Sequence, residues 1–161
     1  MKCRHRSRGF TMVELITIIM ILGILAVVAL PRMESADGFR DVEFRDRAIA
    51  ALRYAHKTAS SHRRLVCVTL TAESIQLRID NSLPKNDACD VDLAIPGSNV
   101  AIVQAGRNGF ANAPVPAVLF FQPDGRVTSD AAGVVIANFD NTVGGANVLV
   151  RGATGYVGDG T

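Results

Sequence analysis

The chain has 161 residues, with 17 Lys and Arg against 15 Asp and Glu, and hence a net charge of +2. Four basic residues and no acid precede Phe10, so the chain from Phe10 onward holds 13 basic and 15 acidic side chains, a balance of −2. That balance does not indicate a nucleic-acid-binding protein, and the length suffices for one domain with a hydrophobic core.

Residues 10–30 form an apolar run that contains one ionisable residue, Glu14. A helix of these 21 residues is about 30 Å long, which matches the hydrocarbon thickness of a bilayer. We therefore predict a membrane-spanning helix over residues 10–30, with a bend at Pro31, because proline removes one intrahelical hydrogen bond. A carboxylate in such a segment costs about 2.5–3.5 kcal/mol on insertion scales, so Glu14 is expected to have a partner and a function.

The basic segment 1–9 carries Lys2, Arg4, Arg6 and Arg8. Positive charge beside an apolar span keeps that flank in the cytoplasm. Cleavage before Phe10 would create an ammonium one helical turn from Glu14, which could pair with it within one chain or between neighbouring chains. In the second case, assembly would neutralise a charge that membrane insertion left unpaired.

Two other interpretations of the N-terminal segment are an ordinary secretory signal peptide and a plain single-pass anchor. The apolar region of a signal peptide has about 7–15 residues, whereas residues 10–30 are a longer run that also contains an acid. Neither interpretation explains Glu14, because an acid inside a membrane segment usually has a function.

Residues 31–62 are expected to form the amphipathic half of the same long helix, which docks on a sheet. Polar residues separate apolar ones at helical spacing. The apolar positions expected to face the sheet are Val42, Ile49, Leu52, Ala55 and Ala59.

A β-rich head is expected over residues 63–161. Residues 65–71 and 74–79 have the composition and alternation of a β-hairpin, and turn residues at Pro123-Asp124-Gly125 and Gly144-Gly145 separate later strands. The further predicted strands are 100–104, 117–122, 126–129, 134–138, 147–151 and 155–157. A helix followed only by short strands indicates an α+β fold with an antiparallel sheet.

Cys67 and Cys89 are the two cysteines that remain once the segment containing Cys3 is removed. The basic flank places them outside the cytoplasm, where oxidising conditions favour a disulfide. A metal pair is the alternative, but no His or third Cys lies near them in the sequence. We therefore predict a disulfide between Cys67 and Cys89.

The sequence R-G-F-T-M-V-E-L, followed by an apolar helix and A-L-P-R, resembles the N-terminal signature of type IV pilins and type II secretion pseudopilins. The resemblance implies that Gly9 and Phe10 flank the processing site, that Phe10 is N-methylated, that Glu14 acts in assembly and that Pro31 kinks the helix. It further implies a pilin-like fold, with a long kinked helix packed on the β head.

Scattered stretches of the head resemble the minor-pilin branch of the GspH and FimT proteins and of the minor subunits of mannose-sensitive haemagglutinin pili. These stretches are 51–59, 63–70, 89–94, 120–126 and 154–157. Some members of that branch bind DNA through a basic G-R-x-R near the C-terminus. Here Gly155 is followed by Tyr156 and Val157, so both arginines are missing. The basic knot His62-Arg63-Arg64 is expected to interact with the helix C-terminus rather than with DNA.

The sequence contains no pairing of a nucleophile with a base and no phosphate-binding loop, so no enzymatic activity and no cofactor are expected. His56 is interpreted as a hydrogen-bonded, partly buried side chain, because general acid–base catalysis needs positioned partners. Asn86, Asp87, Asp90 and Asp92 form an acidic loop that could hold Ca²⁺, although it lacks EF-hand spacing and is interpreted as solvated. The glycines of residues 152–160 do not open a helix, which excludes a dinucleotide-binding loop.

The predicted function is that of a minor pilin or pseudopilin, a structural subunit of a type IV pilus or a type II secretion pseudopilus. The expected partners are other pilin subunits, the prepilin peptidase that also methylates Phe10, and the inner membrane of a bacterium, with the head in the periplasm. The alternative is a tip-located subunit that captures DNA or a surface ligand. The sequence leaves open whether the filament is a retractile pilus or a secretion pseudopilus.

Overall fold

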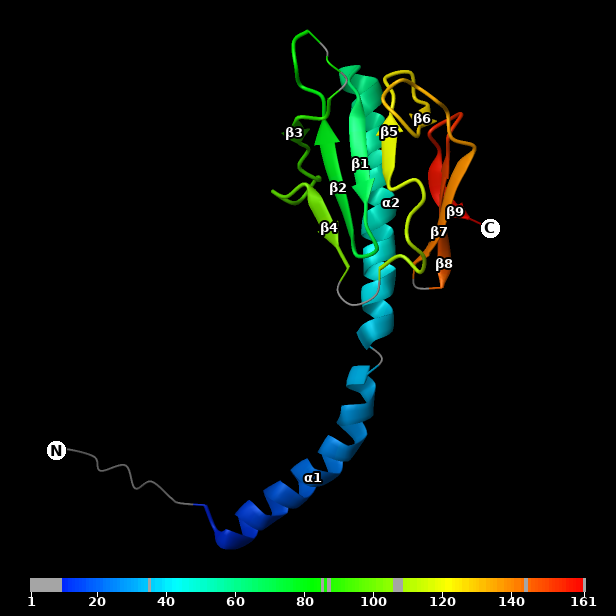
Figure 1. Ribbon diagram of the computed structural model, residues 1–161. Helices are drawn as coiled ribbons and strands as arrows, with labels where there is room; N and C mark the ends of the chain where they lie inside the picture. Colours follow the sequence, from blue (N-terminus) through cyan, green and yellow to red (C-terminus); the bar gives the residue numbers. More distant parts are fainter. Residues whose placement is uncertain are drawn as a thin grey trace, which may run out of the picture. The chain divides into compact units, whose positions relative to one another are not determined.

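The computed structural model describes residues 10–34, 36–84, 86, 88–105, 109–143 and 145–160, with backbone alone for residues 28–34 and 36–39. The chain divides into two compact units, Met1–Ala36 and Asp37–Thr161. The first unit contains helix α1 (Met12–Glu34), and the second contains nearly all of helix α2 (Ala36–His62) and the strands (Figure 1).

Helix α1 continues through Pro31 and ends three residues later, at Glu34. This agrees with the expectation that Pro31 does not terminate the helix. The bend predicted at Pro31 stays a prediction.

The strands in the described residues form two antiparallel sheets. In the first sheet β1 pairs with β2 and β5, β5 pairs with β6, and the far edge of β2 pairs with both β3 and β4. The second sheet has the order β7-β8-β9. The strands are β1 (Val66–Leu70), β2 (Ser74–Ile79), β3 (Val91–Asp92), β4 (Ile102–Gln104), β5 (Val118–Phe121), β6 (Val127–Thr128), β7 (Asn138–Val143), β8 (Ala146–Arg151) and β9 (Val157–Gly160).

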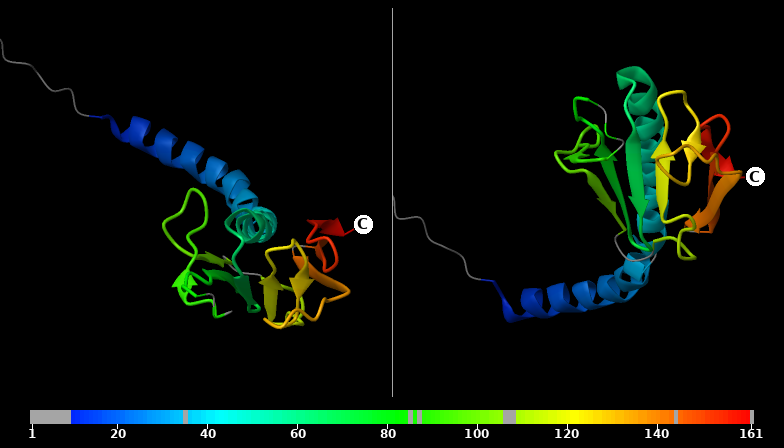
Figure 2. Two further views of the ribbon diagram at one scale, coloured as in Figure 1. Left: turned by 90° about the horizontal axis from the view of Figure 1, so that it is seen from above. Right: turned by 45° about the horizontal axis from the view of Figure 1, so that its top comes forward.

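Helix α2 covers one face of the strands, which form an arc on one side of the helix in the view from above (Figure 2, left). Inward-facing strand residues such as Val68, Leu77 and Val148 share one core with the buried stripe of α2. Three aromatic rings connect the second sheet to the helix, because Phe110 lies 5.7 Å from Phe44 of α2 and 6.3 Å from Phe139 of β7 between ring centroids. The helix and the antiparallel sheets together confirm the α+β, pilin-like fold.

The buried stripe of α2 differs at one point from the predicted one. Val42 is 50% exposed, so its expected contact with the sheet was wrong. Phe44, two residues later, occupies the core instead, because it precedes Ala48 by four residues and side chains at that spacing share a helix face. The other four predicted positions are buried.

The C-terminus of α2 is capped by its own backbone. Arg63 adopts a positive φ of 50°, and the Arg64 N–H donates to the Ala59 carbonyl over 3.2 Å. This arrangement is a Schellman motif, which satisfies a carbonyl that the helix leaves free. The Arg64 side chain turns away from the helix and donates to the Ser82 carbonyl at 2.5 Å. The predicted interaction of the basic side chains with the helix C-terminus therefore stays a prediction, because the cap is formed by backbone groups.

Strand β9 is joined to α2 by two arginines. Arg45 forms an ion pair with Asp159, and Arg53 Nε donates to the Val157 carbonyl at 3.0 Å. These contacts fix the edge of the second sheet against the helix, across more than 100 residues of sequence.

Most of the predicted strands are present with shifted ends, and one is wrong. The hairpin of residues 65–71 and 74–79 corresponds to β1 and β2. Residues 134–137 are not a strand, because only Val135 makes an isolated bridge, to Thr128. The strand β7 begins where that prediction ended, at Asn138.

Candidate processing and assembly site

Helix α1 begins with a side-chain cap. Thr11 precedes the first helical residue, and its Oγ1 accepts a hydrogen bond of 3.2 Å from the Glu14 backbone N–H. The Thr11 carbonyl accepts the next bond, 3.1 Å from the Leu15 N–H. Thr and Glu three residues apart are the sequence signature of a capping box. This cap was not predicted, although the sequence T-M-V-E has its pattern.

The cap places the Glu14 carboxylate in the first turn of α1, where the helix dipole favours negative charge. The Glu14 side chain is exposed, and within the described residues its carboxylate has no hydrogen-bond or ion-pair partner. Phe10 is 77% exposed. Gly9, on the other side of the predicted cleavage point, lies outside the described residues.

Exposed apolar side chains continue from this first turn along α1. Every described side chain from Phe10 to Val27 is exposed, and Met12, Val13 and Ile24 are each more than 65% accessible. An apolar surface of this kind marks a site for contact with protein or lipid. A membrane crossing by residues 10–30 stays a prediction, because no helix within the described residues is both long enough and apolar enough to cross a membrane.

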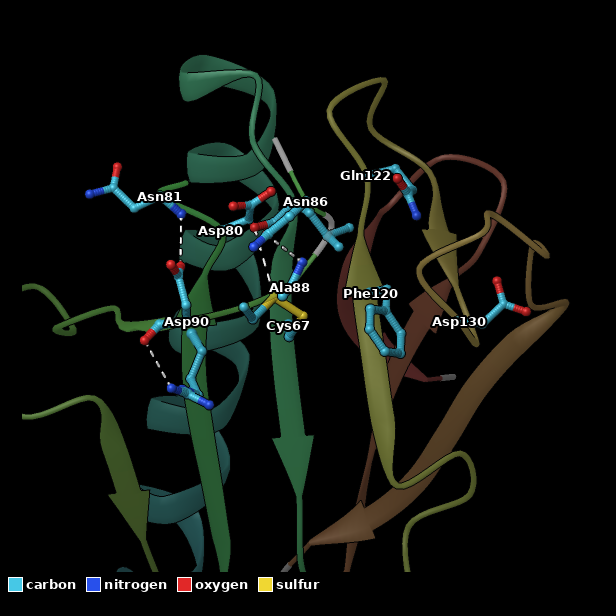
Figure 3. The surroundings of a disulfide bond; sticks show 12 residues. Cys67, Asp80, Asn81, Asn86, Ala88, Asp90, Phe120, Gln122 and Asp130 are labelled. Atoms are coloured by element: carbon cyan, nitrogen blue, oxygen red, sulfur yellow. Dashed lines mark hydrogen bonds between the residues drawn. A yellow bond between two sulfur atoms is a disulfide. The ribbon is translucent and has the colours of Figure 1, made fainter. Parts of the chain in front are cut away.

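The predicted disulfide is present between Cys67 in β1 and Cys89 in the loop before β3, with 5.9 Å between the Cα atoms. Cys67 pairs across the sheet with Phe120 of β5, on the face away from α2 (Figure 3). The bond therefore fastens the loop after β2 to the centre of the first sheet.

Replacing both Cys67 and Cys89 with Ser should lower the free energy of unfolding. The two residues are 22 positions apart, and the chain-entropy model assigns about 3 kcal/mol to closing a loop of this size. Urea denaturation of the purified full-length protein, followed by circular dichroism, measures the change. Reduction of the unmodified protein should give the same loss, and an unchanged urea midpoint in both experiments would contradict the prediction.

The carboxylates of the acidic loop form hydrogen bonds and ion pairs with residues close to the loop. Asp90 Oδ1 accepts the Asn81 N–H at 3.0 Å, and Asp92 pairs with Arg78 Nε at 3.2 Å. Asp80 accepts the Ser82 N–H at 2.9 Å, and Asp87 lies outside the described residues. Among those that are described, no group of three His, Cys, Asp or Glu side chains could hold a metal ion. Calcium binding here has no support from the described geometry.

The turn of residues 122–126 is held by Asp124. Its Oδ1 accepts the Arg126 N–H at 3.0 Å, and its Oδ2 accepts Arg126 Nε at 2.7 Å. The side-chain hydrogen bond from Arg126 is the main cause that holds the pKa of Asp124 below its usual value. The turn residue Gly125, with φ of 91°, then presents its carbonyl toward α2.

His56 of α2 forms a hydrogen bond with that turn. The sequence predicted a hydrogen-bonded, partly buried histidine at this position, and the structure confirms it. Its Nε2 lies 3.1 Å from the Gly125 carbonyl oxygen and therefore carries the proton that it donates. Gly155, which has a positive φ of 66°, lies so close that an added Cβ would be 2.4 Å from His56 and 2.3 Å from the Gly125 oxygen. Residues 51–59, 120–126 and 154–157, which are far apart in the sequence, thus meet at one junction.

Residues 4–30 match the prokaryotic N-terminal methylation motif. The match spans the basic segment and the capped, apolar first part of α1. No curated protein and no solved structure matches the chain. The motif covers Gly9, Phe10 and Glu14, and its matched range includes the exposed first part of α1, from Met12 to Val27. The chain therefore carries the N-terminal methylation motif of type IV pilin-like prepilins, which indicates a membrane-anchored precursor of a filament subunit.

Proposed function

We propose that the protein is a minor pilin or pseudopilin, a non-enzymatic structural subunit of a type IV pilus or a type II secretion pseudopilus. A prepilin peptidase cuts the chain between Gly9 and Phe10 and methylates the new amine of Phe10. The main support is the methylation motif at residues 4–30, which coincides with a helix that exposes apolar side chains and an acid in its first turn.

The exposed residues of α1 suit two successive environments. In the precursor, residues 10–30 lie in the bacterial inner membrane and the head lies in the periplasm, because the basic segment stays in the cytoplasm. In the filament, the same apolar surface packs against α1 of neighbouring subunits. The Glu14 carboxylate then pairs with the Phe10 ammonium of a neighbour, since a charge in an apolar environment needs a partner.

The junction at His56 supports assignment to the GspH and FimT branch. The stretches of the head that resemble this branch are far apart in the sequence, and three of them supply His56, Gly125 and Gly155. Stretches that meet at one junction in the fold support the assignment better than scattered similarity in the sequence does.

The intact mass of the protein extracted from membranes tests the processing. We expect the mass of residues 10–161 plus one methyl group, because the motif positions both reactions at Phe10. A cell lacking its prepilin peptidase should retain the mass of residues 1–161. Finding the unprocessed mass in a peptidase-positive cell, or a new N-terminus beyond residue 30, would overturn the proposed function.

A further inference from the structure

The face of the second sheet that points away from α2 carries a regular set of side chains. On the other face, Phe139, Val148 and Val157 are buried in the core that the sheet shares with α2. Successive residues of a strand point to opposite faces, so the neighbours of these core residues form what we call the outer face. Its members are Asn138, Asp140 and Thr142 of β7, Asn147, Leu149 and Arg151 of β8, Tyr156 just before β9, and Gly158 and Gly160 of β9.

The pairing of the strands aligns the outer face in rows. Arg151 lies opposite Asn138 of β7, and its backbone N–H donates to the Tyr156 carbonyl at 2.9 Å, which places Tyr156 in the same row. In the next row Leu149 lies opposite Asp140. Residues that face each other across two strands have Cβ atoms about 4.5–5.5 Å apart. Side chains of both rows can therefore contact one ligand.

Tyr156 lies over a gap in the outer face. Gly158 pairs with Leu149 and has no side chain, and a Cβ added to it would clash with the Tyr156 hydroxyl. The Tyr156 ring therefore extends along β9 over Gly158. The Arg151 guanidinium carbon lies 6.0 Å from the centre of the ring. Because Tyr156 is still 54% exposed, its ring is available for contact with a ligand.

A hollow of about 610 Å³ adjoins the Tyr156 ring. It is lined by Leu149, Arg151, Thr154, Tyr156 and Asp159. Its volume is within the range of about 300–1,000 Å³ that is typical of ligand sites. The turn between β8 and β9 is held in place, because the Gly152 N–H donates to the Ala137 carbonyl at 3.3 Å and Gly155 packs against His56. A site on such a turn needs little ordering when it binds.

The side chains of the outer face suit an uncharged sugar ring. An aromatic ring such as that of Tyr156 stacks on the apolar C–H face of a sugar. Arg151 donates several hydrogen bonds and Asp140 accepts them, so together they can bind adjacent hydroxyl groups. Within the described residues neither of these two side chains forms an ion pair. Their charges are opposite, so the face does not select a charged ligand.

A peptide or a nucleic acid fits the outer face less well. Strand β8 is paired on both sides, so its backbone groups cannot form the main-chain hydrogen bonds by which a peptide adds to a sheet. Arg151 is the only basic residue of the segment 127–161, which contains three acids. Phosphate groups bind to clusters of basic residues, and this segment has none.

We propose that the outer face of the second sheet binds a neutral polysaccharide. Tyr156 stacks on a sugar ring in the hollow, and Arg151 and Asp140 form hydrogen bonds with its hydroxyl groups. This inference goes beyond the proposed structural role, because it assigns a ligand to the head. It does not depend on cleavage before Phe10.

Saturation-transfer NMR of the full-length protein in detergent tests the site, with cellopentaose, a neutral chain of glucose units, as the probe. Irradiation of the protein's aromatic protons should transfer magnetisation mainly to the C–H protons on one face of the glucose rings, because that face stacks on Tyr156. Tyr156→Ala should weaken binding by about fivefold or more, whereas Tyr156→Phe should keep the affinity within about twofold, since it keeps the ring.

Further variants test the position of the ring and the polar contacts. Gly158→Ala keeps all the binding side chains but displaces the Tyr156 ring, so it should weaken binding as Tyr156→Ala does. Arg151→Ala and Asp140→Ala should each weaken binding by about threefold or more, since each removes hydrogen bonds. The matched control Arg47→Ala changes an exposed arginine on α2 and should have no effect. Circular dichroism of each variant checks that the head is folded.

Three results would overturn the proposal. The first is the absence of transfer to cellopentaose in the unmodified protein. The second is binding that the variants of Tyr156 and Gly158, or those of Arg151 and Asp140, leave unchanged. The third is binding of oligothymidylate in place of cellopentaose, which would assign the Tyr156 ring to single-stranded nucleic acid. All three leave the proposed function intact, whereas failure of cleavage before Phe10 would refute that function and leave the sugar site intact.

Discussion

Replacing Glu14 with Ala should lower the content of this protein in filaments by at least about tenfold, while its amount in the membrane stays unchanged. Removing one partner of a buried ion pair costs about 3–5 kcal/mol, because the other charge stays buried without compensation. In the precursor, the cost is absent, since the Phe10 nitrogen is still part of a peptide bond. Quantitative immunoblots of sheared filaments and of membranes measure the two amounts.

Two further variants separate the charge of Glu14 from its place in the helix cap. Glu14→Gln keeps the shape of the side chain and removes the charge, so it should assemble as poorly as Glu14→Ala. Thr11→Ala removes the hydroxyl that accepts the Glu14 N–H and costs about 1 kcal/mol of helix stability, but it keeps the carboxylate and should assemble. Normal filament content of Glu14→Ala would show that the acid has no assembly role.

The second large effect is expected for Gly155→Ala, which should reduce the free energy of unfolding of the head by about 2–4 kcal/mol. An added Cβ would lie 2.3 Å from the Gly125 oxygen and 2.4 Å from the His56 ring, and overpacking of this kind costs about 1–3 kcal/mol. The positive φ of 66° adds about 1 kcal/mol for a residue with a Cβ. Urea denaturation of the detergent-solubilised protein, followed by far-ultraviolet circular dichroism, measures the loss.

Gly145→Ala is the matched control for the steric part of this effect. Gly145 has a similar positive φ of 80°, but nothing lies within 4 Å of an added Cβ there. We expect it to lose only the conformational part, about 1 kcal/mol. Equal losses in the two variants would mean that the junction of His56, Gly125 and Gly155 does not hold the head together.

Several features of this protein could be predicted from short stretches of its sequence, because they depend on interactions between residues that are close together in the chain. The apolar run with its single acid requires no knowledge of the head, and the match of residues 4–30 to the methylation motif confirms the resemblance to a prepilin signal. The hairpin of β1 and β2 follows from alternation and a short turn. Four of the five apolar positions predicted for α2 are buried, because helical periodicity alone selects a face.

Strand β7 was missed because its pattern depends on partners that are distant in the sequence. Its sequence F-D-N-T-V places Asn141 among the inward-facing positions, and Asp and Asn disfavour strands. In the structure Asn141 is 6% exposed, and its side-chain amide donates to the Asn112 carbonyl at 3.0 Å. A buried amide is stable only with such a partner, and nothing in the local sequence pattern identifies a partner 29 residues away.

The N-terminal motif, the helical periodicity and the α+β order could all be predicted from the sequence alone, since each depends on residues within a few turns or one hairpin. The pairing of Cys67 with Cys89 was also predicted, because the two are the only cysteines from Phe10 onward. The sequence carried no signal for two other contacts between distant groups, which are visible only in the fold: Arg45 with Asp159, and His56 with the turns at Gly125 and Gly155. The physical reason is that side-chain pairing across the fold depends on the register and closure of sheets, which are properties of the whole chain.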